Sequence, residues 1–118
     1  MAAGHWHDQA QLLATQSRAL RQLIPEVYSG YAGLAEASTA AGALDAKTKE
    51  LIALAIGVAK QCDGCIGAHA RSAARAGASR QEVAEALGVT IMMDGGPGTV
   101  WAARALAAFD EYDTAAGG

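Results

Sequence analysis

Two cysteines and a histidine in the stretch KQCDGCIGAHARSAARAG, residues 60–77, are the residues whose types and spacing could do chemistry. Cys62 and Cys65 are the only cysteines of the chain, and His69 follows four positions later. On a helix the three positions fall within a wedge of about 60° and share one face. Cys65 and His69 are one turn apart and can meet, whereas about 10 Å along the axis separates Cys62 from His69. Cys62 could bond to Cys65 if it lies at the loose start of the helix.

Glu50 is the fourth candidate. In one straight helix Glu50 would lie about 18 Å from Cys62 and could contribute nothing. Asp63 and Gly64, however, are a helix cap and a weak point, so we expect the chain to break at about residues 61–63 and to turn back. Glu50 would then face His69 from the adjacent helix. A carboxylate among apolar neighbours would hold the imidazole in one tautomer and share its proton.

Three interpretations of Cys62, Cys65, His69 and Glu50 compete. The plainest is a pair of buried thiols with a capping or surface histidine. A structural zinc site needs four ligands, which these residues could supply, but mixed cysteine and histidine sites usually join two loops. The third is a redox pair, in which a thiolate at a helix N-terminus beside an imidazole has a lowered pKa.

The redox interpretation accounts for more of these residues. Lowering a thiol pKa from about 8.5 to about 6.5 speeds its reaction at neutral pH only about threefold, because nucleophilicity falls with pKa. A positioned proton donor or base is worth about 10² to 10⁴. We therefore expect His69 to handle a proton, with Glu50 behind it, and we expect neither a metal nor a bound cofactor.

The rest of the chain is expected to form helices. Alanine supplies much of the 52% hydrophobic content and aromatic residues only 5%, which favours closely packed helices over strands. Asp45 is a candidate N-cap, Ser79 and Glu82 match a capping box, and Gly77 suits a helix C-terminus. The sequence predicts an all-α single domain over residues 1–118, with about six helices at residues 8–23, 25–42, 46–61, 63–77, 79–93 and 99–112.

Composition and patterning also bear on partners and location. A formal net charge of -3 without a basic stripe argues against nucleic acid as a partner. The lack of a long apolar run argues against a membrane, and MAAGHWHDQAQ is unlike a signal peptide, so we expect a cytoplasmic protein. We expect residues 5–7 to be loosely ordered, and Met92 and Met93 to fill the core. The helix after Glu50 is apolar nearly all round, which predicts burial on most sides and a homo-oligomer.

The spacing of Glu50, Cys62, Cys65 and His69 resembles the E-x11-C-x2-C-x3-H signature of alkylhydroperoxidase D-like proteins, within the wider carboxymuconolactone decarboxylase family. The flanking segments LDAKTKELIALAIGVAKQC, GAHARSAARAGASRQEVAEAL and MMDGGPGTVWAARALAAFDEY agree with it. The resemblance covers about residues 25–112. It implies an all-helical, alkylhydroperoxidase D-like bundle that assembles as a homotrimer or homohexamer.

The resemblance also implies an activity, thiol-dependent reduction of hydroperoxides. Cys65 would attack the peroxide, Cys62 would resolve the sulfenic acid into a disulfide, and a dithiol or lipoyl-bearing reductant would restore both thiols. Glu50 and His69 match the proton relay. Gly64 stands where the best-studied family members carry a second histidine, so one relay member is missing here. A non-peroxidatic dithiol/disulfide oxidoreductase and a redox-sensing structural oligomer remain the alternatives.

Overall fold

The computed structural model describes residues 4–115, and every regular element in that range is an α-helix. The helices are α1 (His5–Leu23), α2 (Pro25–Thr39), α3 (Ala46–Ala59), α4 (Asp63–Arg75), α5 (Arg80–Asp94) and α6 (Gly96–Ala115). The predicted all-α fold with six helices is therefore confirmed. None of the helices in this part of the chain is long and apolar enough to cross a bilayer.

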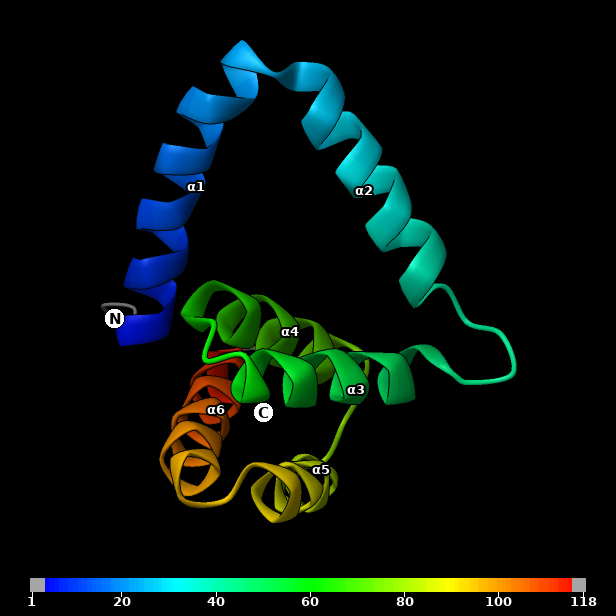
Figure 1. The fold of residues 1–118 in the computed structure, drawn as a ribbon, viewed down its shortest axis with the longest axis vertical. Helices are drawn as coiled ribbons and strands as arrows, with labels where there is room; N and C mark the ends of the chain where they lie inside the picture. The colour runs from blue at the N-terminus through cyan, green and yellow to red at the C-terminus, as the bar shows by residue number, and fades with distance from the viewer. Residues whose placement is uncertain (1–3, 116–118) are drawn as a thin grey trace.

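The six helices form a body and an arm (Figure 1). Helices α3, α4, α5 and α6 pack together as the body, in which α6 lies against both α4 and α5. Helices α1 and α2 rise from the body as an open V, here called the arm, whose two ends touch α4 and α3. The arm therefore reaches over the N-terminal end of α4, where the two cysteines lie.

Local signals in the sequence fix most helix ends. Asp45 accepts the backbone N–H of Thr48 at 2.8 Å as the N-cap of α3, as predicted. The capping box of Ser79 and Glu82 opens α5. Gly77 adopts a φ of 86° after α4, where the N–H groups of residues 77 and 78 close the helix onto earlier carbonyls. These ends follow from side-chain and backbone hydrogen bonds that need no distant partner.

The core of the body consists of a few large side chains among many alanines. Its largest fully buried side chains are Phe109, Leu54, Ile66, Val58 and Val83. Alanines on α4 and α6, among them Ala70, Ala73, Ala105 and Ala108, are buried as well. Small side chains let the helix axes approach closely, which is how so few aromatic residues can fill this core.

Several expectations about helix limits and burial were wrong. Helix α1 begins at His5, inside the segment expected to be loose, because Trp6 is buried against the body. Helix α2 ends at Thr39, and α6 begins at Gly96 because Pro97 is suited to a first helical turn. Met92 and Met93 are 72% and 76% exposed, since they point away from the body.

Helix α3 also differs from its expectation. It was expected to be buried on most sides, but within one chain it is buried along one face only, through Leu54, Gly57 and Val58. Ile52 and Ile56 are 45% and 50% exposed and line open pockets between α3 and α5. An apolar strip of α3 is thus left open.

Candidate active site

The predicted break between the two halves of the site lies at residues 60–62. Helix α3 ends at Ala59, and the N–H groups of Gln61 and Cys62 turn back onto the carbonyls of Val58 and Gly57. Gln61 adopts a φ of 55°, the left-handed conformation usually taken by glycine. This sharp reversal sets α4 antiparallel beside α3, so residues before and after it come together.

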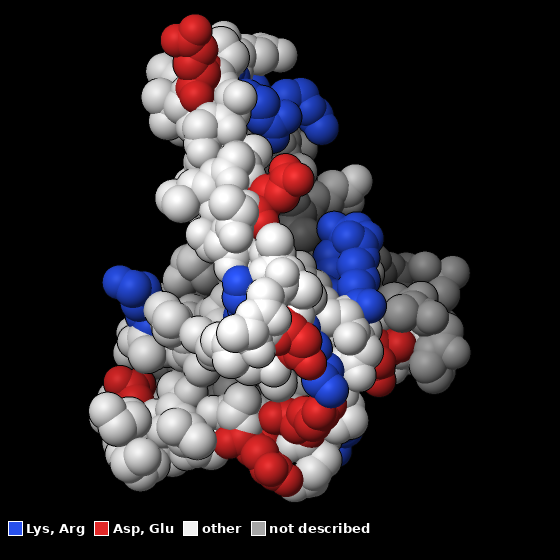
Figure 2. All heavy atoms as spheres, turned by 90° about the vertical axis from the view of Figure 1, so that its right-hand side faces the viewer, with Lys and Arg blue, Asp and Glu red and all other residues white. Residues whose placement is uncertain are grey.

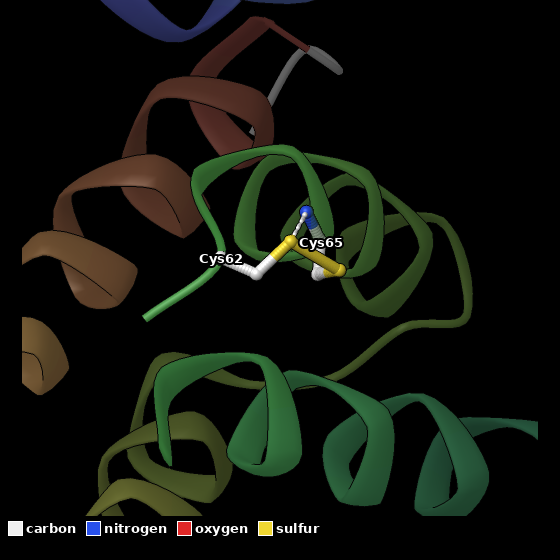
Figure 3. The surroundings of a disulfide bond; sticks show 2 residues. All are labelled: Cys62 and Cys65. Atoms are coloured by element: carbon white, nitrogen blue, oxygen red, sulfur yellow. Dashed lines mark hydrogen bonds between the residues drawn. A yellow bond between two sulfur atoms is a disulfide. The ribbon is translucent and has the colours of Figure 1, made fainter. Parts of the chain in front are cut away.

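Cys62 and Cys65 are joined by a disulfide, with their Cα atoms 5.2 Å apart (Figure 3). Cys62 is the N-cap of α4, and its sulfur accepts the backbone N–H of Cys65 at 3.2 Å. The pair therefore sits at the N-terminus of a helix, where unpaired N–H groups stabilise negative charge on sulfur.

Glu50 and His69 are hydrogen-bonded across the two helices. Nδ1 of His69 on α4 lies 2.7 Å from Oε1 of Glu50 on α3. The Glu50 side chain is only 13% exposed, against 31% for His69, so the imidazole is the member open to solvent. An ionised Glu50 accepts the Nδ1 proton and leaves Nε2 free to take or give one. The predicted convergence of these two residues is confirmed.

The cysteine pair and His69 line one pocket of about 530 Å³ beneath the arm. Its walls come from α1, α2 and α4: Gln9, Leu12, Leu13, Gln16, Tyr31, Cys62, Gly64, Cys65, Ala68 and His69. The arm contributes two leucines and a tyrosine together with two glutamines, and the polar atoms of the cysteine and histidine side chains lie on the α4 wall. Glu50 is not among the lining residues but is hydrogen-bonded to His69, which is.

The pocket wall from α1 lies close to the cysteine pair. A Cβ atom on Gly64 would come 3.1 Å from Cδ2 of Leu13, and one on Gly67 would come 3.4 Å from the ring of Trp6. Leu13 therefore occupies space that a side chain at position 64 would need. This contact gives a physical reason why glycine stands between the cysteines here.

Helix α1 is held in place by the last helix. The carboxylate of Glu111 accepts the backbone N–H groups of Trp6 and His7, at 3.1 and 2.7 Å, and also contacts Nδ1 of His7. Burial alone raises the pKa of Glu111, but these hydrogen bonds outweigh it and hold the pKa below its ordinary value. The hydroxyl of Tyr112 donates to the carbonyl of Trp6.

A second ion pair touches the cysteine motif itself. Nη2 of Arg104 on α6 lies 2.8 Å from Oδ1 of Asp63, the residue that follows Cys62. Neither Arg104 nor Glu111 was singled out from the sequence. Each is more than 40 residues away in the chain from the residue that it bonds. No local sequence pattern indicates so distant a partner.

The four predicted site residues thus fall in one place, as a disulfide and a hydrogen-bonded pair. In residues 4–115 no three His, Cys, Asp or Glu side chains are grouped so as to hold a metal ion. The disulfide joins the two sulfur atoms that the zinc interpretation would use as thiolate ligands.

Comparisons with known proteins agree on one family. The model of the carboxymuconolactone decarboxylase family matches residues 25–108. An uncharacterised protein from Cupriavidus necator is 45% identical over 95 residues, covering 80% of this chain and 84% of that protein. A crystal structure of a carboxymuconolactone decarboxylase family protein from Legionella pneumophila has a TM-score of 0.88 and 45% identity, covering 92% of this chain and 96% of that one.

A second solved relative comes from Thermotoga maritima. It is a carboxymuconolactone decarboxylase family protein with a suggested role in antioxidative response, with a TM-score of 0.67 and 31% identity. The comparison covers 80% of this chain and 86% of that one. Sequence and structure therefore agree, and the chain belongs to the carboxymuconolactone decarboxylase family.

Proposed function

We propose that the chain is a thiol-dependent peroxidase of the alkylhydroperoxidase type, which reduces hydroperoxides through Cys65 and Cys62. The observation that carries the proposal is the hydrogen bond of His69 to Glu50, on the same face of α4 as Cys65 and in the same pocket. A proton relay beside a reversible dithiol has little use in a purely structural protein. The suggested antioxidative role of the Thermotoga maritima relative supports the same chemistry.

The first half-reaction begins from the reduced pair. The thiolate of Cys65 attacks the terminal oxygen of a hydroperoxide, the O–O bond breaks, and Cys65 becomes a sulfenic acid. The departing alkoxide takes a proton and leaves as an alcohol. Nε2 of His69 is the donor for this proton, because Nδ1 is engaged by Glu50. Glu50 stabilises the imidazolium before transfer and keeps the ring in one orientation.

The second half-reaction closes the disulfide seen in this structure. The thiolate of Cys62 attacks the sulfur of Cys65, and the hydroxide that leaves takes a proton and becomes water. An external dithiol, such as a lipoyl group, then reduces the disulfide by two successive exchanges. A dithiol reductant is suited to a reducing compartment, which supports a cytoplasmic location.

We also propose that copies of the chain associate, as a trimer or hexamer. The arm carries exposed apolar side chains on both helices, including Leu20 and Leu23 of α1 and Val27 and Leu34 of α2. Helix α2 has only two charged residues, and Figure 2 shows the largely uncharged face it presents. Apolar surface of this extent is typical of an interface.

The deciding experiment is peroxide consumption with dithiothreitol as the reductant, for the wild type and for Cys62→Ser and Cys65→Ser. Both variants are expected to lose turnover. In a single turnover after prereduction and removal of dithiothreitol, Cys62→Ser should consume one equivalent and keep a sulfenic acid at Cys65 that dimedone traps, whereas Cys65→Ser should react far more slowly. A faster reaction at Cys62 would reverse the two roles.

Two further outcomes would reject peroxidase activity. If the wild type reduces disulfide substrates but consumes no peroxide, the chain is a dithiol/disulfide oxidoreductase. If neither substrate is turned over while the disulfide still forms and breaks, a redox-sensing oligomer is the better description. Cumene hydroperoxide and hydrogen peroxide should be tested side by side, since the apolar wall of the pocket favours the former.

A further inference from the structure

Asp63 places a negative charge inside the cysteine motif. It is the first residue of α4 and follows Cys62 directly, so its carboxylate lies on the same helix end as both sulfurs. An uncompensated carboxylate at this position opposes the formation of a second negative charge on sulfur. The reduced state of the pair needs such a charge if Cys65 is to react as a thiolate.

Arg104 supplies the compensating charge from another helix. Its Nη2 lies 2.8 Å from Oδ1 of Asp63. The guanidinium also lies over two aromatic rings, 5.4 Å from the centroid of Trp6 and 5.0 Å from that of Trp101. Its Nε is buried without a hydrogen-bond partner among the described residues. The charge is therefore fixed in position by α1 and α6 together.

Stability alone is a weak account of this arrangement. The two side chains of the ion pair are 37% and 34% exposed, and ion pairs of that exposure contribute little to folding. Burying Nε of Arg104 without a partner even has a cost. What the arrangement does achieve is a neutral net charge next to the cysteines.

We propose that Arg104 is a positioning residue that neutralises Asp63 and thereby sets how readily the disulfide between Cys62 and Cys65 is reduced. Glu50 and His69 also lie near the pair and are bonded to each other, and Lys60 precedes Cys62 by two residues in the chain. The inference rests on the proposed function only in that the pair cycles between disulfide and dithiol. It does not depend on which oxidant or substrate drives the cycle.

The equilibrium with glutathione isolates this effect. Two glutathione thiols form one glutathione disulfide and give two electrons, the bond between Cys62 and Cys65 breaks and accepts them, and Cys62 takes a proton. Cys65 then carries the thiolate, and the second proton goes to solvent. Any charge that destabilises this thiolate makes the disulfide harder to reduce.

The test is the equilibrium constant for reduction by glutathione at neutral pH. In Arg104→Gln the unpaired carboxylate should lower the constant about threefold, the size expected for one partly screened charge. In Asp63→Asn the unpaired guanidinium should raise it by a similar factor. The double variant, neutral at both positions, should return to within about twofold of the wild type.

A matched ion pair provides the control. Arg80 on α5 and Asp110 on α6 are bonded at 2.8 and 3.0 Å, beyond the opposite end of α4. Arg80→Gln and Asp110→Asn should leave the glutathione equilibrium unchanged. Circular dichroism and a thermal melt of each variant establish that it is folded.

The result that overturns the proposal is equally distinct. If the ion pair were merely structural, the equilibrium constant would change in the same direction in both single variants, or in neither. The constant of the double variant would then be no closer to that of the wild type. Opposite shifts that cancel support charge compensation. Because no peroxide is used, these outcomes stay separate from those of the peroxidase assay, and either proposal can fail alone.

Discussion

Gly57 of α3 and Cys65 of α4 are so close that a Cβ atom on Gly57 would come 3.2 Å from Cβ of Cys65. The carbonyl of Gly57 also accepts the backbone N–H of Cys62 at 3.0 Å. One residue of α3 thus contacts both ends of the cysteine motif. The absence of a side chain there sets the distance between the two helices at the disulfide.

Gly57→Ala should therefore disturb the motif. The added methyl group has to push α4 away from α3, and we expect a loss of about 1–3 kcal/mol in the free energy of unfolding and slower closure of the disulfide. Gly88→Ala on exposed α5 is the matched control, since a Cβ atom there would have nothing within 4 Å. Helix propensity should stabilise that variant by about 0.5–1 kcal/mol. Urea unfolding and thiol-trapping kinetics measure both effects, and equal behaviour of the two variants would contradict the contact.

Gln61→Gly should stabilise the protein. Gln61 has a φ of 55°, which a residue with a side chain adopts at a cost of about 1 kcal/mol. Glycine removes that cost but increases the conformational entropy of the unfolded chain. The free energy of unfolding is therefore expected to rise by only about 0.5 kcal/mol. Chemical unfolding checks the sign. Gln81→Gly, in the first turn of α5, should instead lose stability in the same assay.

His69→Ala should slow the oxidation of Cys65 by about 10²-fold, because the variant lacks the proton donor. A lower thiolate population alone would explain only about threefold. Glu50→Gln should slow it less, since an amide oxygen can still accept the Nδ1 proton. Stopped-flow oxidation of the reduced protein measures both. His5→Ala, at the exposed start of α1, serves as the control. An unchanged rate in His69→Ala would leave the relay without a role.

The bond network of Glu111 makes the anchoring of α1 depend on pH. The pKa of Glu111 is below the ordinary value of 4.5, so the stabilisation is complete above that pH and is lost as the pH falls through the lowered value. Glu111→Gln should cost about 1–2 kcal/mol near neutral pH. Its melting temperature should approach that of the wild type only in acid. Glu36→Gln on α2 is the control. If the difference in melting temperature between Glu111→Gln and the wild type did not change with pH, ionisation of Glu111 would not be what anchors α1.

The open faces of the arm predict association. Val27 and Leu34 of α2 are each 64% exposed. Val27→Asp and Leu34→Asp should reduce the molar mass measured by light scattering at micromolar concentration, because a buried charge opposes contact between copies. Gln22→Glu adds the same charge at an exposed polar position of α1 and should have no effect. A wild type that is monomeric in this measurement would remove the assembly proposal.

The sequence was sufficient where the determinants are local. Asp45, Ser79 and Gly77 close their helices with bonds to near neighbours, so the corresponding ends were predicted. The contact between Glu50 and His69 was also predictable. In one straight helix the two residues are too far apart to touch, so they can meet only if the chain reverses between them. The chemical roles of these residues remain predictions.

What could not be predicted depends on contacts between distant segments. Trp6 is buried because α6 holds the start of α1 through Glu111, 105 residues away in the chain. The exposure of Met92 and Met93 has the same origin, since an apolar residue is buried only if another segment covers it. Composition gives no information about which segment that is.

The anchoring of α1 by Glu111 and Tyr112 has a consequence for biosynthesis. A ribosome releases α1 well before the residues that hold it, because Glu111 follows Trp6 by 105 residues in the chain. Until then Trp6 of α1 has no complete body to pack against, while local helices can already form. We therefore expect the α1 wall beside the cysteines to be added last, so that the thiols of a nascent chain are more accessible to oxidants than those of the folded protein.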